Sequence, residues 1–500
     1  MKTLLAACVV CTLVVSVQAE GWIPAGPGAL GMGGAEVALP GQPLSAAANP
    51  AFLAEKKQKY SVLLPITFQL GVEGDIVEAA DKLINDFDDS GVKASFDNLK
   101  ANSTNPAADV ANIVNFLSTR AKSLDKPGQG LLASIQGKLD VFHRGWGLSA
   151  GTRQYAGATV IFDSNFNFSA TDGGSLIKPG AVKPATIADT TVSDTALVSD
   201  IATKAAVSSG TDLASTKIQT LVNSIKTKNG ESSLSDSSKS LLISTIKSVN
   251  QSNVPGAQQA SSAGINNNTG LELRYLDLRE ASLGYGFSFD EGRFLVAPAL
   301  KVMTGKAVFS RVTVADATSE SKNIGDELRD AKNGKSSSDF SADLGLVWKP
   351  RERLTLGLVG RDLTSPSFKT PSGGKIKLDA GVRAGAAFAY SLKPGLLGSL
   401  ALDADVVRTN SGLLMGADQQ QVGLGLSQNL SRWFALRLGA SRDLASLNDG
   451  WSYGAGLGLR VSHLYLDVAG AISSDKVTVD GDDFPARGAT GIMLGWNMEV

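Results

Sequence analysis

Hydrophobic residues alternate with small or polar residues along much of this chain. Apolar side chains stand at the odd positions from Tyr453 to Val461, and glycine, arginine or serine stands between and after them. The same period of two recurs near 283–289, 376–383 and 434–439. Because successive side chains of a strand point to opposite faces, the pattern predicts strands with one apolar face and one small or polar face.

The length of the alternation separates two kinds of antiparallel sheet. A soluble sandwich or barrel also alternates, but its strands usually have about 5 to 6 residues. Here the alternation persists close to the roughly 9 to 11 residues that a tilted strand needs to cross a membrane. We expect about fourteen antiparallel strands, near 60–72, 131–142, 146–162, 271–289, 294–312, 339–349, 354–363, 376–390, 399–408, 420–428, 433–443, 452–462, 463–473 and 488–498. The sequence therefore predicts an all-β transmembrane barrel.

The connections between these strands alternate between tight and long. In bacterial outer-membrane barrels the tight turns face the periplasm and the long loops face outward. The tight joints lie at 143–145, 290–292, 350–352, 392–395, 431–432 and 462–463. We therefore expect these turns at the periplasmic rim of an outer-membrane barrel from a Gram-negative bacterium.

Two of the predicted outer loops are very large. Residues 73–130 contain amphipathic patterns, including Ile76, Val77, Ala80, Leu83 and Ile84, which indicate helices. Residues 163–270 are rich in Ser, Thr, Ala, Asn and Lys, a composition that does not readily build its own core. We expect helical insertions in both loops. Whether they form a functional cap or variable decoration stays open.

The start of the chain has two parts before the barrel. Residues 1–19 combine Lys2, a short apolar run and Val17-Gln18-Ala19, which predicts a cleaved secretory signal peptide. Residues 20–55 are rich in Gly, Ala and Pro and show no long alternation. Such a segment can enter the lumen as a hatch or plug, or remain a flexible leader. We assign residues 56–500 to the barrel.

The chain offers little material for catalysis or metal binding. Its cysteines, Cys8 and Cys11, fall in the predicted signal peptide, and its histidines, His143 and His463, fall at predicted turns. We therefore expect no enzymatic activity, no catalytic residue, no metal site and no cofactor. The formal net charge of -1 gives no reason to expect nucleic acid as a partner.

Charged residues on the small or polar phase of the strands are expected to face the lumen. Both signs occur, so pairing across strands is favoured over an ion-selective ring of one sign. The main luminal candidates are Lys377, Asp379, Arg383, Asp403, Asp405, Arg437 and Arg460, and the same phase includes Lys138, Asp140, Arg153, Glu272, Arg274, Lys301, Asp343 and Asp467. These charges predict a plugged, salt-bridged lumen.

Two short motifs near the N-terminus resemble the start of FadL-type outer-membrane transport barrels. They are the glycine-rich run Gly28–Ala35 and the Asn49-Pro50-Ala51-Phe52-Leu53 box. The resemblance implies that this segment lies as a hatch inside a fourteen-stranded barrel. The expected hatch residues are Gly31, Gly33, Gly34, Asn49 and Pro50.

Nearly the whole mature chain is similar to the conjugal-transfer TraF-like barrel family. The resemblance is carried by the segments 60–65, 79–87, 356–368, 376–385 and 400–405. A thioredoxin-like periplasmic protein shares the TraF label. The predicted mature chain has no cysteine, so no redox role transfers to it.

These resemblances leave two functions open. One is FadL-like passage of a hydrophobic small molecule, with the hatch moving. The other is a structural or surface-interaction barrel linked to conjugation or envelope assembly, without transport. The implied partners are outer-membrane lipid and the barrel assembly machinery, with a hydrophobic small molecule in the first case and conjugation or envelope proteins in the second.

Overall fold

The computed structural model describes most of the predicted barrel and the segment before it. The described residues are 24–74, 128–161, 270–313 and 335–499, apart from 43, 56–57, 372, 394–395, 411–417, 449 and 480–481, together with short pieces at 76–116, 167–168, 222 and 265–266. The predicted signal peptide at 1–19 and most of the insertions at 73–130 and 163–270 lie outside these residues.

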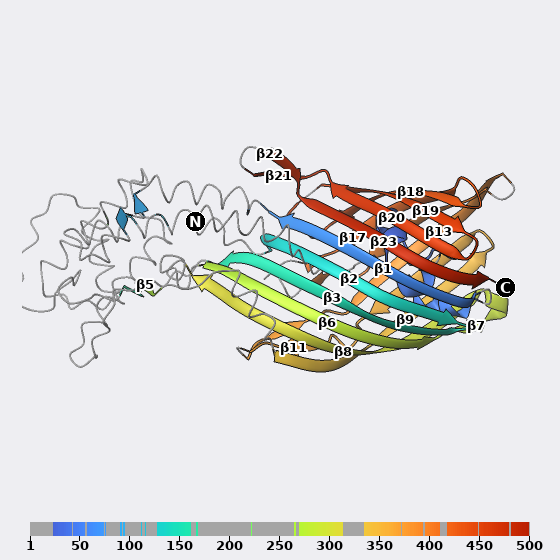
Figure 1. Cartoon of the computed structure of the whole chain (residues 1–500), viewed down its shortest axis with the longest axis horizontal. Coiled ribbons are helices and arrows are strands. Elements are labelled where there is room, and N and C mark those ends of the chain that lie inside the picture. Colours follow the sequence, from blue (N-terminus) through green and yellow to red (C-terminus); the bar gives the residue numbers. More distant parts are fainter. Residues whose placement is uncertain are drawn as a thin grey trace, which may run out of the picture.

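The wall is a closed antiparallel barrel of fourteen strands, shown in Figure 1. The short β7 continues β6, and both pair with β8, which closes the sheet. The strands are β1 (Gln58–Glu73), β2 (Gly130–His143), β3 (Trp146–Ile161), β6 (Gly270–Tyr285) with β7 (Phe287–Phe289), β8 (Phe294–Thr313), β9 (Lys335–Arg351), β10 (Leu354–Arg361), β13 (Gly381–Lys393), β14 (Leu396–Asp405), β17 (Gln421–Asn429), β18 (Phe434–Asp443), β19 (Ser452–Val461), β20 (Leu464–Ser473) and β23 (Arg487–Glu499). The predicted all-β barrel is confirmed.

The outer face of this wall is apolar, as a bilayer requires. Along β19, Leu457 is 48% exposed, whereas Gly456 and Gly458 on either side are buried. Other exposed apolar residues around the wall are Leu148, Leu283, Leu300, Phe340, Leu400, Leu424, Leu438, Val468 and Ile492. In water such a surface would be costly, so the wall fits a membrane-spanning position. Among the described residues, no helix is both long and apolar enough to cross a bilayer.

Exposed aromatic residues gather at the end of the barrel that carries the tight turns. The rings of Trp146 and Tyr285 lie 4.7 Å apart, and those of Tyr285 and Phe287 lie 5.0 Å apart. Other exposed aromatics near this end are Tyr60, Phe289, Phe294, Trp348, Trp433 and Trp496. Aromatic girdles of this kind mark the boundary between lipid and water in transmembrane barrels.

The two ends of the barrel differ in their connections. At one end, which we call the tight-turn end, Arg144 and Gly145 join β2 to β3 with φ values of 46° and 89°. Two consecutive residues with positive φ form the turn that matches the twist of a hairpin. The opposite end, which we call the loop end, carries the long connections. There the strands from β1 to β9 extend further, since β8 has 20 residues whereas β14 and β19 have 10 each.

The N-terminal segment, residues 24–55, lies inside the barrel. It contains the helices α2 (Pro27–Leu30) and α3 (Ser45–Ala48) and the 3-10 helix η1 (Pro50–Ala54). Most of its side chains are buried, including Met32 at 1% exposure and Phe52 at 1%. In Figure 1 the segment is the blue chain between the strands near the tight-turn end.

Several short elements lie in the connections. The link between β10 and β13 forms a separate two-stranded hairpin, which pairs with no wall strand. The short elements are β4 (Asn167–Phe168), β5 (Ile265–Asn266), η3 (Asp290–Gly292), β11 (Ser367–Lys369), β12 (Lys375–Lys377), β15 (Thr409–Asn410), β16 (Asp418–Gln419), β21 (Lys476–Val479) and β22 (Asp482–Pro485). The predicted strand 376–390 therefore needs correction. Its first residues belong to β12, and the wall strand begins at Gly381.

Candidate functional site in the barrel lumen

The N-terminal segment packs its backbone directly against glycines of the wall. Gly33 and Gly34 have φ values of 66° and 81°, which glycine adopts without strain. A side chain on Gly439 of β18 would collide with the backbone of Met32. Wall glycines that meet the backbone of the segment in the same way are Gly286, Gly345, Gly357, Gly423, Gly425 and Gly454. The inner wall is therefore shaped to the segment's main chain.

The expected hatch residues Gly31 and Asn49 also contact the wall. A Cβ atom on Gly31 would lie 3.0 Å from the Cα of Gly456. The Asn49 side chain accepts the amide of Ala51 at 3.0 Å, so it caps η1 at Pro50. Its Nδ2 donates to the carbonyls of Val37 at 3.0 Å and Leu346 at 3.2 Å. One buried amide thus joins two parts of the segment to β9.

Charged side chains of β13 and β14 hold the same segment. Asp403 is 1% exposed, and its Oδ2 accepts the amides of Glu36 and Val37, both at 2.8 Å. Arg383 pairs with Asp405 at 2.7 Å and donates to the Gly34 carbonyl at 3.4 Å. These luminal candidates therefore bind backbone groups of the segment as well as each other.

The luminal candidates Arg437 and Arg460 make different contacts. Arg437 pairs with Asp467 at 3.1 Å and donates to Gln42 of the N-terminal segment at 3.3 Å. Arg460 lies on the inner face of β19 near the tight-turn end, with its guanidinium 5.0 Å from the ring centre of Tyr465. Arg437 therefore links the N-terminal segment to the wall pair that it forms with Asp467.

Lys377 and Asp379 do not lie in the wall where the alternation predicts them. Lys377 is the last residue of β12, with 58% of its side chain exposed, and it pairs with Asp379 at 3.0 Å. Their neighbour Ile376, expected to face lipid, is 2% exposed and packs inside. The reason is that the chain leaves the wall after β10 and returns only at Gly381.

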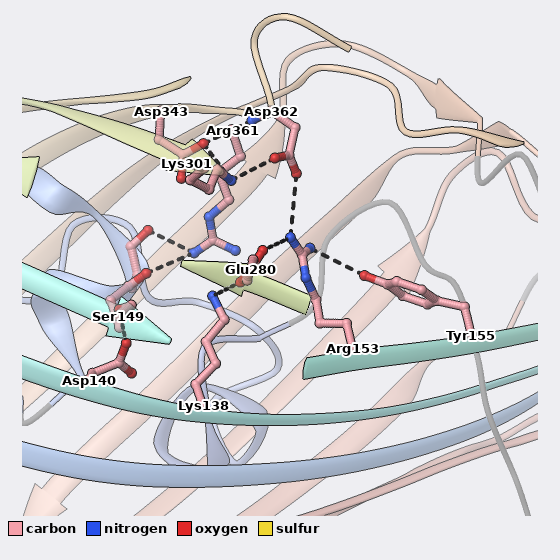
Figure 2. Close-up of polar contacts among 12 residues, drawn as sticks. Lys138, Asp140, Ser149, Arg153, Tyr155, Glu280, Lys301, Asp343, Arg361 and Asp362 are labelled. Carbon is pink, nitrogen blue, oxygen red and sulfur yellow. Dashed lines mark hydrogen bonds and ion pairs between the residues drawn. The ribbon is translucent and has the colours of Figure 1, made fainter. Parts of the chain in front are cut away.

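Six charged side chains meet inside the lumen, from five neighbouring strands and the residue after β10 (Figure 2). We call them the central charge cluster, and they are Lys138, Arg153, Glu280, Lys301, Asp343 and Asp362. Glu280 pairs with Lys138 at 2.7 Å and also with Arg153. Lys301 bridges Asp343 at 2.7 Å and Asp362 at 2.6 Å. The charges of opposite sign alternate, so the cluster is internally neutralised.

Asp362 gives this cluster its link to the loop end. Burial acts to raise the pKa of the Asp362 carboxyl, but Lys301 and Arg153 outweigh burial and hold that pKa below its usual range. The carboxylate form is therefore the one that the folded protein stabilises. Removal of Lys301 would take the close cation from both Asp343 and Asp362 and leave Asp362 only the more distant Arg153, at 4.0 Å, which is costly at a buried site.

An apolar layer lies next to the charges, toward the loop end. We call it the upper apolar cluster, and its buried members are Leu132, Ala133, Tyr155, Leu276, Leu278, Met303, Ala307, Phe368 and Ile376. Tyr155 connects the two layers, because its hydroxyl accepts Nη1 of Arg153 at 3.2 Å. Leu276 and Leu278 occupy the same strand face as Glu280, so the inner wall changes from charged to apolar within one strand.

A small cavity lies between the N-terminal segment and the wall strands β18 and β20. Its volume of about 30 Å³ is enough for about one water molecule. The segment lines it with apolar residues, among them Ala29, Met32, Leu39, Leu44 and Ala48, and with the polar Glu36, Gln42 and Ser45, and the wall lines it with the Arg437–Asp467 pair. A larger molecule could enter only if the segment moved.

Sequence reasoning missed four members of these luminal contacts, namely Glu280, Arg361, Asp362 and Glu36. Glu280 shares the phase of Glu272 on β6, so the alternation could have identified it. Asp362 follows the end of β10, and Glu36 lies in the irregular segment, where it pairs with Arg361 at 3.5 Å. No period of two applies to either position, so only the fold could place them.

The histidines lie at tight turns, where the centre of the His143 ring is 4.2 Å from that of the Tyr60 ring.

Fold and lumen together define a transmembrane β-barrel whose interior is filled by its own chain and by paired charges. A family model described as "F plasmid transfer operon, TraF, protein" matches residues 46–410. The chain belongs to this family, so the membership predicted from its sequence segments is confirmed. No curated protein matches the chain.

Several solved structures are similar to the chain. The Ralstonia pickettii toluene transporter TbuX is 10% identical, with 95% of this chain and 98% of that chain covered and a TM-score of 0.41. The P. putida toluene transporter TodX is 9% identical, with 96% and 100% covered and a TM-score of 0.42. A Pseudomonas aeruginosa FadL homologue is 9% identical, with 96% and 98% covered and a TM-score of 0.38. The family model, and not these distant likenesses, identifies the chain.

Proposed function

We propose that this barrel admits small hydrophobic molecules across the outer membrane and that its N-terminal segment is the hatch. The observation that carries the proposal is the cavity between the segment and the wall, whose lining is largely apolar. Binding sites for small molecules are mostly apolar with a few placed polar groups, and here the polar groups come from Glu36, Gln42, Ser45, Arg437 and Asp467. The names of TbuX and TodX as toluene transporters agree with this substrate class.

Transport requires the hatch to move, because the cavity is only about 30 Å³ in the closed arrangement. A side chain that fills the cavity should therefore hinder the opening or the passage. Ala48 lines the cavity and is 2% exposed. Ala404 lies on the outer face of β14 and is exposed, so it offers a matched site for the same substitution.

The experiment measures uptake of a radiolabelled monocyclic hydrocarbon, toluene, by cells that express the barrel. Ala48→Leu should reduce uptake several-fold, whereas Ala404→Leu should leave it unchanged. Uptake by the unaltered protein that does not exceed uptake by cells without the barrel would contradict the proposal. Equal uptake by both variants would locate the route away from this cavity.

The proposal includes the route by which the protein reaches the membrane. Residues 1–19 would be removed as a signal peptide, residues 20–55 would form the hatch, and residues 56–500 would form the barrel. The last strand places Ile492, Leu494 and Trp496 on its outer face, which supports recognition by the barrel assembly machinery. The tight-turn end would then face the periplasm.

A second candidate is a surface scaffold linked to conjugation, without transport. The observation that favours it is the density of paired charges and glycine contacts inside the lumen, which would make a rigid, closed barrel. The family's description by the F plasmid transfer operon agrees with this candidate. A mating assay distinguishes it, because removal of residues 163–270 should lower transfer frequency if the scaffold is the function and leave it unchanged if uptake is.

A further inference from the structure

The connection between β10 and β13 folds into the barrel. We call residues 367–377, with β11 and β12, the inner hairpin. The amide of Ser367 donates to Asp339 Oδ2 at 2.9 Å, and the amide of Lys369 donates to Ser337 Oγ at 3.0 Å. Both acceptors stand on the same face of β9 as Gly345, which meets the N-terminal segment. The hairpin therefore lies on the luminal face of the wall.

Apolar side chains fix the hairpin in this position. Phe368 is 0% exposed and Ile376 is 2% exposed, and both belong to the upper apolar cluster with Leu278. Gly305 of β8 leaves the space that the Phe368 ring occupies, since a side chain there would collide with the ring. In a connection at the end of a membrane barrel, solvent exposure is the default. Burial of both side chains shows that the hairpin is built to pack inward.

The hairpin has no hydrogen-bonded ladder with the wall. β11 pairs with β12 in a sheet of two strands, separate from the barrel. Its charged anchor is Asp362, which Lys301 holds at 2.6 Å within the central charge cluster. The hairpin can therefore leave the lumen without breaking any pairing between wall strands, because side chains and single amide contacts are what hold it.

We propose that the inner hairpin is a second gate, which closes the lumen at the loop end independently of the N-terminal segment. The inference rests on the proposed function, because a gate has meaning only if the lumen is a route. It adds that a molecule entering from outside must first displace Phe368 and Ile376 from the upper apolar cluster. Asp362, five residues before the hairpin, stays in the central charge cluster while the hairpin moves.

The test compares the ion conductance of four refolded proteins in planar bilayers. They are the unaltered chain, a variant lacking Gly28–Asn49, a variant in which two glycines replace Ser367–Lys377, and the variant with both changes. Two barriers in series pass current only when both are removed. We expect conductance in the double variant to exceed that of either single variant by at least about tenfold. Heat-dependent gel mobility checks that each barrel has folded.

Two results would overturn the second gate. If removal of Gly28–Asn49 alone conducts as well as the double variant, the hairpin is no barrier. If the folded double variant does not conduct, closure lies elsewhere in the lumen. Neither result depends on hydrocarbon uptake, so a failure of the proposed function is recognised separately by the uptake assay with unaltered protein.

A second measurement covers the case in which a deletion variant does not fold. The chain has no cysteine besides Cys8 and Cys11, so Met303→Cys adds a reporter beneath the hairpin, at a position that is 0% exposed. Phe368→Ala should raise its labelling by a membrane-impermeant maleimide at least about tenfold, because loss of a buried ring shifts local opening strongly. Lys377→Cys, already exposed, should label equally with and without Phe368→Ala. Unchanged labelling at Met303→Cys would overturn the gate.

Discussion

The two pieces of chain inside this barrel are held in different ways. The N-terminal segment contacts the wall through its main chain, at glycines such as Gly439 and Gly345. The inner hairpin is held mainly through side chains, with Phe368 in an apolar layer, two amides bonded to wall side chains, and Asp362 beside Lys301 in the chain just before it. A side chain added to one of these wall glycines would collide with the main chain of the N-terminal segment. A side-chain contact, in contrast, can be removed by substituting a single residue. The two closures should therefore respond to different substitutions.

Lys301→Met should have the largest effect and should act on the inner hairpin alone. It removes the cation between Asp343 and Asp362, and loss of one partner from a buried pair costs about 3 to 5 kcal/mol. Maleimide labelling should rise at Met303→Cys and stay unchanged at Ala51→Cys, a reporter buried within the N-terminal segment itself. Lys306→Met, on the outer face of β8, is the control and should change neither reporter. Faster labelling at both reporters would show that the closures are coupled.

Leu457→Arg should weaken the wall that carries both pieces. Leu457 faces outward near the middle of β19, where arginine costs about 2 to 4 kcal/mol in a bilayer. The measurement is the free energy of unfolding in lipid vesicles by urea. Leu464→Arg, at the start of β20 by the tight-turn end, should cost only about 0 to 1 kcal/mol because it lies near the interface. Equal costs at the two sites would contradict a membrane-spanning wall.

Gly439→Val should loosen the N-terminal segment and leave the inner hairpin in place. The new side chain meets the backbone of Met32, which cannot rotate away, and overpacking costs about 1 to 3 kcal/mol. Labelling should rise at Ala51→Cys and not at Met303→Cys, the reverse of the Lys301→Met pattern. The matched change is Gly470→Val on the outer face of β20, where the nearest atom to a Cβ is 3.7 Å away. If both valines act alike, the glycine contacts do not hold the segment.

Asn49→Ala should give the smallest effect of this series. It removes the cap on η1 and the hydrogen bonds that Nδ2 donates to the carbonyls of Val37 and Leu346, and loss of a capping side chain costs about 0.5 to 2 kcal/mol. Labelling at Ala51→Cys should rise modestly, by less than Gly439→Val produces. Asn410→Ala at the loop end should have no effect on this reporter. An effect of Asn49→Ala larger than that of Gly439→Val would mean that side chains, and not the glycine contacts, dominate the attachment.

The sequence predicted the wall well because each wall strand follows one pattern, the alternation of apolar residues with small or polar residues. The expected strand 452–462 corresponds to β19 at Ser452–Val461, and the expected 488–498 corresponds to β23 at Arg487–Glu499. The rule failed at 376–390, where alternation continues through the hairpin strand β12 and into the wall. Ile376 alternates as a lipid-facing residue does, yet it is buried inside. Alternation reports that a strand has two different faces and does not report which face meets lipid.

The sequence by itself determined the barrel, its number of strands and the order of tight and long connections, because period and length are local properties of the chain. It also supplied the residues of the lumen, since charges such as Arg153 and Lys301 stand on the small or polar phase. Only the tertiary structure decided which charges meet, because partners such as Lys138 and Glu280 are far apart in the chain. It alone placed the inner hairpin, since no local pattern records whether a loop turns outward to water or inward to the lumen.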